Sequence, residues 1–529
     1  MRRLVALATG AALALGLLVV ATPAGATGGT SASAKLASTL AWKSCTDPDM
    51  AGSGALCATL KVPLDWKHPS GPTISLALSM VRHTSSAAAY QGVMLANPGG
   101  PGDPGRWLAT EGGNVPDGVG DTYDWVGFDP RGVGASRPLL RCIPDYFRAD
   151  RPDYRPTTPA LVKTWLHRSA AYATACGKHG GALLAHVSTV DTVQDMDAIR
   201  RALGVGTMSF YGFSYGTYLG QVYATLHPTR VYRMVLDSNV DPRRVWYDAN
   251  LDQDVAFEKT MAAWFTWIAS HHATYDLGRS ERSVKRLFYA QMNALVHKPA
   301  GGVVGPDEWN DLFLEAGYYT STWVELADAF ARWVHKHKAD ELIDEYEATD
   351  TPGDDNAYAM YNAVQCLDAP WPKLWSTWKR DNDRVNKVAP LITWGNAWYN
   401  MPCRTWPVKS GHPVHVSGAK APPVLLIDET LDAATPYTGS LWVRHLFPKS
   451  RLVAVVGGTS HANSLNGNAC VDDAVARYLR NGALPTRRPG AGHADKSCRP
   501  LPLPSPVLDA LQAHASPFAR LGKVPVGLL

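Results

Sequence analysis

A serine flanked by two glycines stands at residues 212–216, which read GFSYG. The motif follows an apolar stretch, residues 207–211, that predicts a β-strand, and it precedes an apolar stretch that predicts a helix. Glycines on both sides of Ser214 permit the sharp strand-to-helix turn that lifts a serine hydroxyl above the edge of a sheet. The dipole of the following helix favours negative charge at the same place. This pattern predicts that Ser214 is a nucleophile.

A serine hydroxyl attacks poorly until a base takes its proton, so a histidine and an orienting carboxylate are also needed. With the serine on such a turn, these partners follow in the order aspartate, then histidine. Asp432 comes shortly after the apolar stretch 423–427, and His461 comes after the apolar stretch 451–456. We predict Asp432 as the acid and His461 as the base. Asp428 is the competing acid, although its place directly after the stretch can instead turn it toward the sheet.

The negative oxygen of a tetrahedral intermediate needs hydrogen-bond donors that are already in place. The backbone NH of Tyr215 is one candidate, because it follows the nucleophile. The second donor is expected from Gly100 in the segment 97–102, which reads NPGGPG, since backbone without side chains can approach a substrate closely. A plain turn of proline and glycine is the alternative interpretation of this segment.

Six short apolar stretches predict the strands that position these residues. They are residues 92–96, 123–128, 207–211, 231–236, 423–427 and 451–456. Helical spacing of apolar residues separates some of them, as at 193–203 and 441–446. Strands that alternate with helices are typical of an α/β fold with a mostly parallel sheet flanked by helices. Each stretch ends in a glycine, proline or aspartate turn, so we expect the functional groups at the C-terminal edge of the sheet.

The alternation of strands and helices stops between residues 241 and 414. Helical periodicity dominates this region, which contains most of the 18 tryptophans of the chain. We interpret residues 241–414 as a large helical cap inserted into an α/β core, whose two parts are residues 39–240 and 415–529. The alternative to substrate contact by the tryptophans is ordinary packing in the interior of the cap.

The N-terminus has the pattern of a targeting segment. Two arginines precede an apolar stretch, and small residues follow around Ala26. We predict a signal peptide at residues 1–26, cleaved near Ala26, and a flexible leader at residues 27–38, so that the mature protein is secreted. The arginine pair also permits twin-arginine export, and an uncleaved membrane anchor is the alternative to cleavage.

Eight cysteines in an exported chain suggest disulfides. In the sequence they fall into near neighbours: Cys45 with Cys57, Cys142 with Cys176, Cys366 with Cys403, and Cys470 with Cys498. We predict four local bridges, although many other pairings are compatible with eight cysteines. A zinc site is the competing interpretation, but the sequence contains no CxxC.

The size and charge of the chain restrict its partners. At 529 residues it is too long for one compact core, and its formal net charge is only +4. So small a charge does not indicate binding to nucleic acid or to an anionic membrane. We expect a monomer with no nucleic-acid partner and no stable membrane association after processing.

Four motifs in combination resemble those of the exported bacterial tripeptidyl aminopeptidases, within the proline iminopeptidase superfamily. They are residues 97–102, 129–136 (DPRGVGAS), 212–216 and 432–436 (DAATP). The resemblance spans nearly the whole mature chain. It implies an α/β-hydrolase fold with a large inserted helical cap, Asp432 as acid, His461 as base, and a specificity pocket in the cap for the free N-terminal end of a peptide. Two features depart from the family pattern: Ser460 stands where a glycine is usual, and Asp103 and Pro104 follow the glycine-rich segment where further glycines are usual.

The resemblance therefore predicts release of short peptides, by our interpretation tripeptides, through an acyl-enzyme on Ser214, without a metal or an organic cofactor. Such an enzyme must hold an ammonium group, which in a partly dry pocket requires carboxylates. Asp368 and Glu258 are our candidates, with a structural role as the alternative for each. An esterase or amidase acting on small or lipid-like acyl compounds is the second hypothesis, since the same triad serves both chemistries. A non-catalytic binding protein on the same fold is the third.

Overall fold

The computed structural model describes residues 40–47, 50, 52–149, 151–349 and 353–506. The predicted signal peptide and leader lie outside these residues. Ten strands of the described chain form one sheet. They are β1 (Lys43–Ser44), β2 (Leu56–Pro63), β3 (Thr73–Val81), β4 (Gly92–Asn97), β5 (Tyr123–Asp129), β6 (Met208–Phe213), β7 (Val231–Asp237), β8 (Leu425–Glu429), β9 (Arg451–Val455) and β10 (Lys496–Cys498).

The strands lie in the order β1-β2-β3-β5-β4-β6-β7-β8-β9-β10. The pairs β1–β2, β2–β3 and β3–β5 are antiparallel, and every other neighbouring pair is parallel. The six predicted stretches correspond to β4 to β9, so the mostly parallel sheet is confirmed. The antiparallel β2, which lies between β1 and β3, was not anticipated.

Helices cover both faces of the sheet, because successive side chains of a strand point to opposite faces. The helices outside the inserted region are α1 (Pro159–Gly180), α2 (Thr189–Ala202), α3 (Tyr215–Leu226), α13 (Thr438–Leu446) and α14 (Ala469–Asn481). In β4, Val93 and Leu95 join the apolar core that α2 and α3 cover. The alternate residues Met94 and Ala96 join a second core, which α14 covers.

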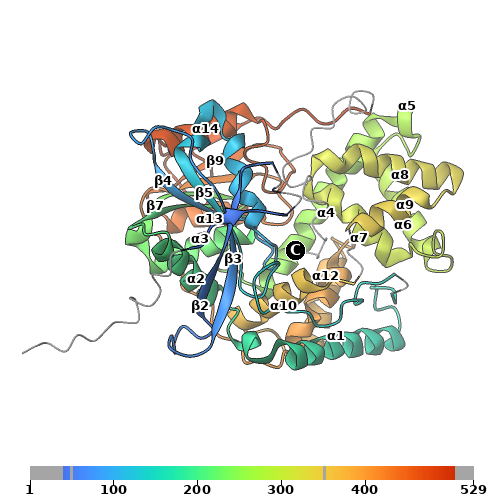
Figure 1. Cartoon of the computed structure of the whole chain (residues 1–529). Helices are drawn as coiled ribbons and strands as arrows, with labels where there is room; N and C mark the ends of the chain where they lie inside the picture. Colours follow the sequence, from blue (N-terminus) through green and yellow to red (C-terminus); the bar gives the residue numbers. More distant parts are fainter. Residues whose placement is uncertain (1–39, 48–49, 51, 150, 350–352, 507–529) are drawn as a thin grey trace, which may run out of the picture.

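Among the described residues, the region between β7 and β8 contains α-helices and no strand of the sheet. These helices are α4 (Tyr247–Ser270), α5 (His272–Tyr275), α6 (Glu281–Leu295), α7 (Pro306–Tyr318), α8 (Trp323–Lys336), α9 (Asp340–Thr349), α10 (Asn356–Asp368), α11 (Trp375–Asn386) and α12 (Thr393–Asn400). Figure 1 shows α4 to α9, in green and yellow, gathered to the right of the sheet. The large inserted helical cap is thus confirmed, whereas the boundaries 241 and 414 stay predictions.

The tryptophans of the cap are mostly core residues. Trp264, Trp309, Trp323 and Trp378 are almost fully buried, and Trp309 packs against Phe313 with ring centroids 4.5 Å apart. Packing in the interior, rather than contact with a substrate, therefore accounts for them.

Helix α1 precedes the cap in the sequence but packs against it. Trp165 of α1 stacks on Trp398 of α12 with ring centroids 5.8 Å apart, and the indole NH of Trp398 donates to the carbonyl of Tyr154. Figure 1 likewise shows α1 beside α12. The cap consequently rests on a helix from the first part of the core.

The four predicted disulfides are present, as Cys45–Cys57, Cys142–Cys176, Cys366–Cys403 and Cys470–Cys498, and no cysteine is free. The third of them joins α10 to the 3₁₀ helix η9 (Met401–Thr405) within the cap. No helix among the described residues is long and apolar enough to cross a membrane.

Candidate active site

The predicted nucleophile lies on a strained turn between β6 and α3. Ser214 has φ 54° and ψ −127°, a left-handed conformation that non-glycine residues rarely adopt. The flanking glycines are required by close packing: a Cβ on Gly212 would lie 2.4 Å from the carbonyl oxygen of Gly216, and one on Gly216 would lie 2.6 Å from that of Asn97. Ser214 stays partly exposed between buried neighbours. The GFSYG pattern thus has a direct steric explanation.

The structure brings Asp432 and His461 into contact. Asp432 follows β8, and its two carboxylate oxygens lie 2.8 and 3.0 Å from Nδ1 of His461. Both side chains are buried. A carboxylate can only accept hydrogen bonds, so Nδ1 carries the proton and Nε2 is left to act as a base. Thr435 orients the carboxylate by donating to it from its amide (2.9 Å) and its hydroxyl (3.1 Å).

Asp428, the competing acid, makes no hydrogen bond with His461. It lies inside β8 and accepts a hydrogen bond from the hydroxyl of Ser440 on α13. Burial, together with the nearby charge of Asp432, raises the pKa of Asp428 well above its usual range. The geometry therefore favours Asp432 over Asp428 as the partner of His461.

Two consecutive residues at the end of β7 hold the serine turn and the histidine loop together. The carbonyl of Asp237 accepts from the amide of Ser214 (3.0 Å). The hydroxyl of Ser238 accepts from the amide of Ala462, next to His461 (2.7 Å). The candidate nucleophile and base are thus anchored to the same strand end, as expected if functional groups gather at the C-terminal edge of the sheet.

The histidine loop is also fixed from β8 and from the cap. Glu429 accepts from the amide of Ser460 (2.7 Å), and burial raises the pKa of Glu429 to about 7. From the end of α7, the carbonyl of Tyr318 accepts from the amide of His461 (2.8 Å). The Tyr318 ring meets the imidazole edge to face at 5.8 Å. Neither Glu429 nor Tyr318 was predicted from the sequence; only Glu429, at a strand end, had a local signal that could have indicated it.

The glycine-rich segment lies against the candidate nucleophile. A Cβ on Gly99 would lie 2.8 Å from Cβ of Ser214 and 3.0 Å from the nitrogen of Tyr215. The amide of Gly99 donates to the side chain of Asn97 (3.1 Å). No described residue accepts a hydrogen bond from the amides of Gly100 or Tyr215. These two amides, the predicted pair, are therefore the available donors for an oxyanion, and that role remains a prediction.

Substitution of Gly99 by alanine should lower kcat about 100-fold or more, because the new methyl group displaces the serine from the oxyanion donors. Gly92→Ala is the matched control: Gly92 has a similar positive φ (95° against 117°), but a Cβ there would meet no atom within 4 Å. It tests backbone strain without the clash. Turnover of a p-nitrophenyl ester measures both variants, and a normal kcat for Gly99→Ala would contradict the steric argument.

The two carboxylates predicted to bind a substrate amine have protein partners. Asp368, at the end of α10, accepts from the amide of Thr189 (2.8 Å), from its hydroxyl, and from the indole NH of Trp246 (3.2 Å). Glu258, on α4, pairs with Lys285. These contacts account for both buried acids without a substrate, so their role in substrate binding stays a prediction that no contact supports.

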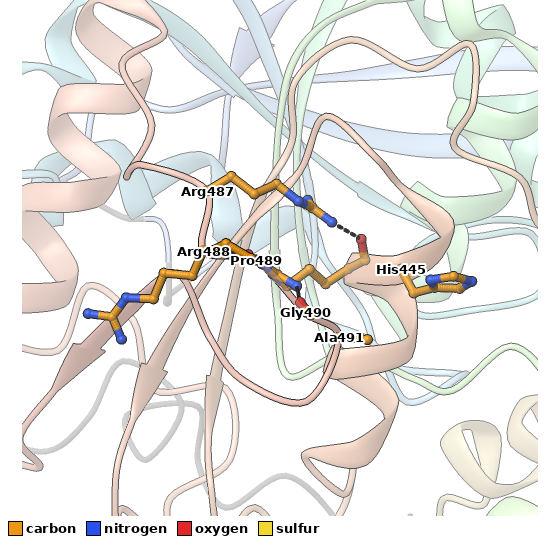
Figure 2. Close-up of a pocket in the computed structure, with 7 residues that line it drawn as sticks. His445, Arg487, Arg488, Pro489, Gly490 and Ala491 are labelled. Atoms are coloured by element: carbon orange, nitrogen blue, oxygen red, sulfur yellow. Dashed lines mark hydrogen bonds between the residues drawn. The ribbon is translucent and has the colours of Figure 1, made fainter.

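A pocket between the end of α13 and residues 487–491 offers no comparable chemistry. It is lined by Arg444, His445 and the chain from Arg487 to Ala491. Arg444 is committed to Asp495 through two hydrogen bonds. Figure 2 shows the side chains of Arg488 and His445 extending in opposite directions, so they do not converge on one ligand. Among the described residues, no group of three or more His, Cys, Asp and Glu side chains could hold a metal ion.

Several known proteins are similar to this chain. A family model described as TAP-like protein matches residues 389–498. The tripeptidyl aminopeptidase of Streptomyces coelicolor is 40% identical over 477 residues, covering 88% of this chain and 87% of that protein. Serine protease Hip1 of Mycobacterium tuberculosis is 31% identical over 483 residues, covering 85% and 90%. Carboxylesterase B of Mycobacterium tuberculosis is 32% identical over 457 residues, covering 82% and 85%.

These similarities agree with the architecture and with the arrangement around Ser214. The region matched by the family model contains β8 and β9, together with Asp432 and His461. The similarity to the Streptomyces coelicolor protein extends over most of both chains, well beyond that region. The chain therefore belongs to the tripeptidyl aminopeptidase family of α/β-hydrolase serine enzymes.

Proposed function

We propose that this protein is a serine exopeptidase that releases short peptides, in particular tripeptides, from the N-terminus of peptide substrates. The observation that carries the proposal is a serine on a strained strand-to-helix turn, together with a buried pair of Asp432 and His461 whose loop is held at the same end of β7. It occurs in a chain 40% identical to a tripeptidyl aminopeptidase. The peptide substrate is inferred from that relative.

In the proposed reaction, Oγ of Ser214 attacks the carbonyl carbon of the scissile bond while Nε2 of His461 takes the hydroxyl proton. The amides of Tyr215 and Gly100 donate to the oxyanion that forms. Asp432 stabilises the imidazolium, which then gives its proton to the leaving amine. Water hydrolyses the acyl-enzyme by the same steps, with His461 again as the base. The N-terminal peptide leaves as a free acid.

An esterase is the second candidate, since one relative bears the name carboxylesterase B at 32% identity. The same triad serves esters and amides, so substrate recognition must separate the two. A carboxylate beside the serine favours a peptidase that binds a free amine, whereas an entirely apolar surface favours an esterase. The pairing of Asp432 with His461 gives no support to the third hypothesis, a non-catalytic binding protein.

We further propose that the mature protein is secreted, with residues 1–26 removed near Ala26, and that it acts as a monomer. Four disulfides are typical of proteins that fold in an oxidising compartment outside the cytoplasm. The proposed units are a core of residues 39–240 and 415–529 and a cap of residues 241–414.

Hydrolysis of a substrate panel by the purified mature protein tests this function. The panel contains p-nitroanilides of one, two or three residues, each with a free or an acetylated N-terminus, and simple p-nitrophenyl esters. We expect the highest kcat/KM for tripeptide anilides with a free amine. Turnover of esters without cleavage of any anilide would instead establish the esterase.

A further inference from the structure

Asp103 lies in the glycine-rich loop, close to the candidate oxyanion donor Gly100. A Cβ added to Gly100 would lie 3.0 Å from the nitrogen and 3.2 Å from the carboxyl carbon of Asp103. The carboxyl group therefore sits beside the place where the substrate's carbonyl oxygen becomes negative. Asp103, Gly100 and Ser214 each stay partly exposed, whereas Pro101 and Gly102 between Gly100 and Asp103 are buried.

The loop that carries Asp103 is held rigidly on both sides. Gly99 lies against Ser214, as described above. A Cβ on Gly102 would lie 2.5 Å from the carbonyl oxygen of Ala357 on α10 of the cap. On the other side of Asp103, a Cβ on Gly105 would lie 2.6 Å from the carbonyl oxygen of Phe128 in β5. Close backbone packing at these glycines restrains the loop that carries the carboxylate.

No described residue donates a hydrogen bond or contributes an ion pair to Asp103. Burial alone raises its pKa to about 6, with no donor to counteract the desolvation. Other buried acids of the chain differ: Asp195 pairs with Arg131, and Asp495 pairs with Arg444. An unpaired, desolvated carboxylate is costly, and its charge acts against the formation of a nearby oxyanion.

Tyr319, at the end of α7, brings the cap within range of the charge of Asp103. Tyr319 is partly buried, and desolvation together with the charges of Glu315, Asp103 and Asp432 raises its pKa far above the ordinary value. The negative charges of Asp103, of the cap residue Glu315 and of Asp432 thus all act on the same side chain, Tyr319. A cation brought by the substrate would balance this charge.

We propose that Asp103 binds the free α-ammonium group of the peptide substrate. This inference rests on the proposed function, in which the amine is at most three residues from the scissile bond. An extended tripeptide spans only about 10 Å, so its amine must bind near Ser214. Asp103 lies in that region, beside Gly100. A substrate with a blocked amine leaves the carboxylate uncompensated beside the oxyanion, which selects against it.

Asp103→Asn tests the proposal, with Asp121→Asn as a control that removes one exposed carboxylate elsewhere. The asparagine keeps the size of the side chain and removes its charge. We expect kcat/KM for tripeptide anilides with a free amine to fall roughly 10- to 100-fold, the scale of a hydrogen bond between charged groups. For the N-acetylated anilides and for a neutral ester, kcat/KM should stay the same or rise.

An unchanged ratio of free to acetylated substrate in Asp103→Asn would overturn the proposal. So would a parallel loss of ester turnover, which would mean that Asp103 supports the loop rather than the amine. Acetylated tripeptides with a lysine side chain test the other source of a cation. If the acetylated lysine peptides are cleaved as efficiently as free-amine peptides, and Asp103→Asn removes that activity, Asp103 binds a substrate side chain and not the α-amine.

Protection of Ser214 from a fluorophosphonate probe provides a readout that does not depend on peptide turnover. Trialanine should slow labelling of the wild type more than N-acetyl-trialanine does, and Asp103→Asn should abolish this difference. No difference in the wild type would contradict an ammonium site. The proposed function fails on a different result, namely the absence of anilide cleavage by the wild type, so the two failures can be told apart.

Discussion

Replacement of Ser214 by alanine lowers kcat for peptide anilides roughly a millionfold and abolishes labelling by a fluorophosphonate. This is the expected result because no other group can form the acyl-enzyme in the proposed reaction, and loss of the nucleophile removes the benefit of the triad as a unit. Residual hydrolysis then depends on substrate binding and on the oxyanion donors alone. Single-turnover kinetics with a p-nitroanilide and mass spectrometry of the labelled protein measure the two effects.

Ser209→Ala is the matched control for this prediction. Ser209 lies in β6, five residues before Ser214, and its buried hydroxyl has no hydrogen-bond partner among the described residues. Removing an unsatisfied hydroxyl from a strand should leave the fold and kcat close to those of the wild type. Substantial activity in Ser214→Ala, alongside a fully active Ser209→Ala, would show that the nucleophile lies elsewhere.

Asp432→Asn should lower kcat roughly 10⁴-fold while leaving KM largely unchanged. The amide of Thr435 donates to one carboxylate oxygen of Asp432, and its hydroxyl donates to the other. An asparagine cannot accept on both sides, because one of its terminal atoms is an NH₂ donor. Whichever way it turns, it loses an orienting contact or presents a donor to Nδ1 of His461, which favours the wrong tautomer. Steady-state kinetics on the free-amine tripeptide anilide measure the loss.

Asp428→Asn is the control for Asp432→Asn. It removes a nearby buried carboxyl group but leaves the hydrogen bond between Asp432 and His461 in place. Burial, together with the charge of Asp432, raises the pKa of Asp428 well above its usual range and so favours its neutral form, whose size and shape asparagine keeps. We expect nearly normal kinetics. If instead Asp428→Asn were the inactive variant and Asp432→Asn the active one, the assignment of the acid would be reversed.

Much of the site could be predicted because its signals are local in the sequence. The glycines at 212 and 216 are needed wherever a strand turns sharply into a helix at a serine, and the packing of their Cα atoms against backbone oxygens shows why. Strand ends are local signals as well. They placed Asp432 and His461 after β8 and β9, where parallel strands bring their C-terminal ends to one edge of the sheet.

Contacts between segments distant in the sequence could not be predicted in this way. The amide of His461 meets the carbonyl of Tyr318, which lies 143 residues earlier in the cap, and nothing in either segment indicates the other. The predicted amine ligands illustrate the same limit. Asp368 and Glu258 were chosen because they are acidic residues of the cap, but whether an acid is paired depends on its neighbours in space.

The sequence by itself determined the serine turn, the order of strands that follow it and the helical nature of the inserted region. Each of these depends on the spacing of residues along a few turns or one strand. Only the tertiary structure decided which aspartate faces the histidine, that α1 packs against the cap, and that Asp103 stands unpaired beside Gly100. The reason is physical: hydrogen bonding and desolvation depend on which groups the fold brings together, and the chain order does not specify those distances.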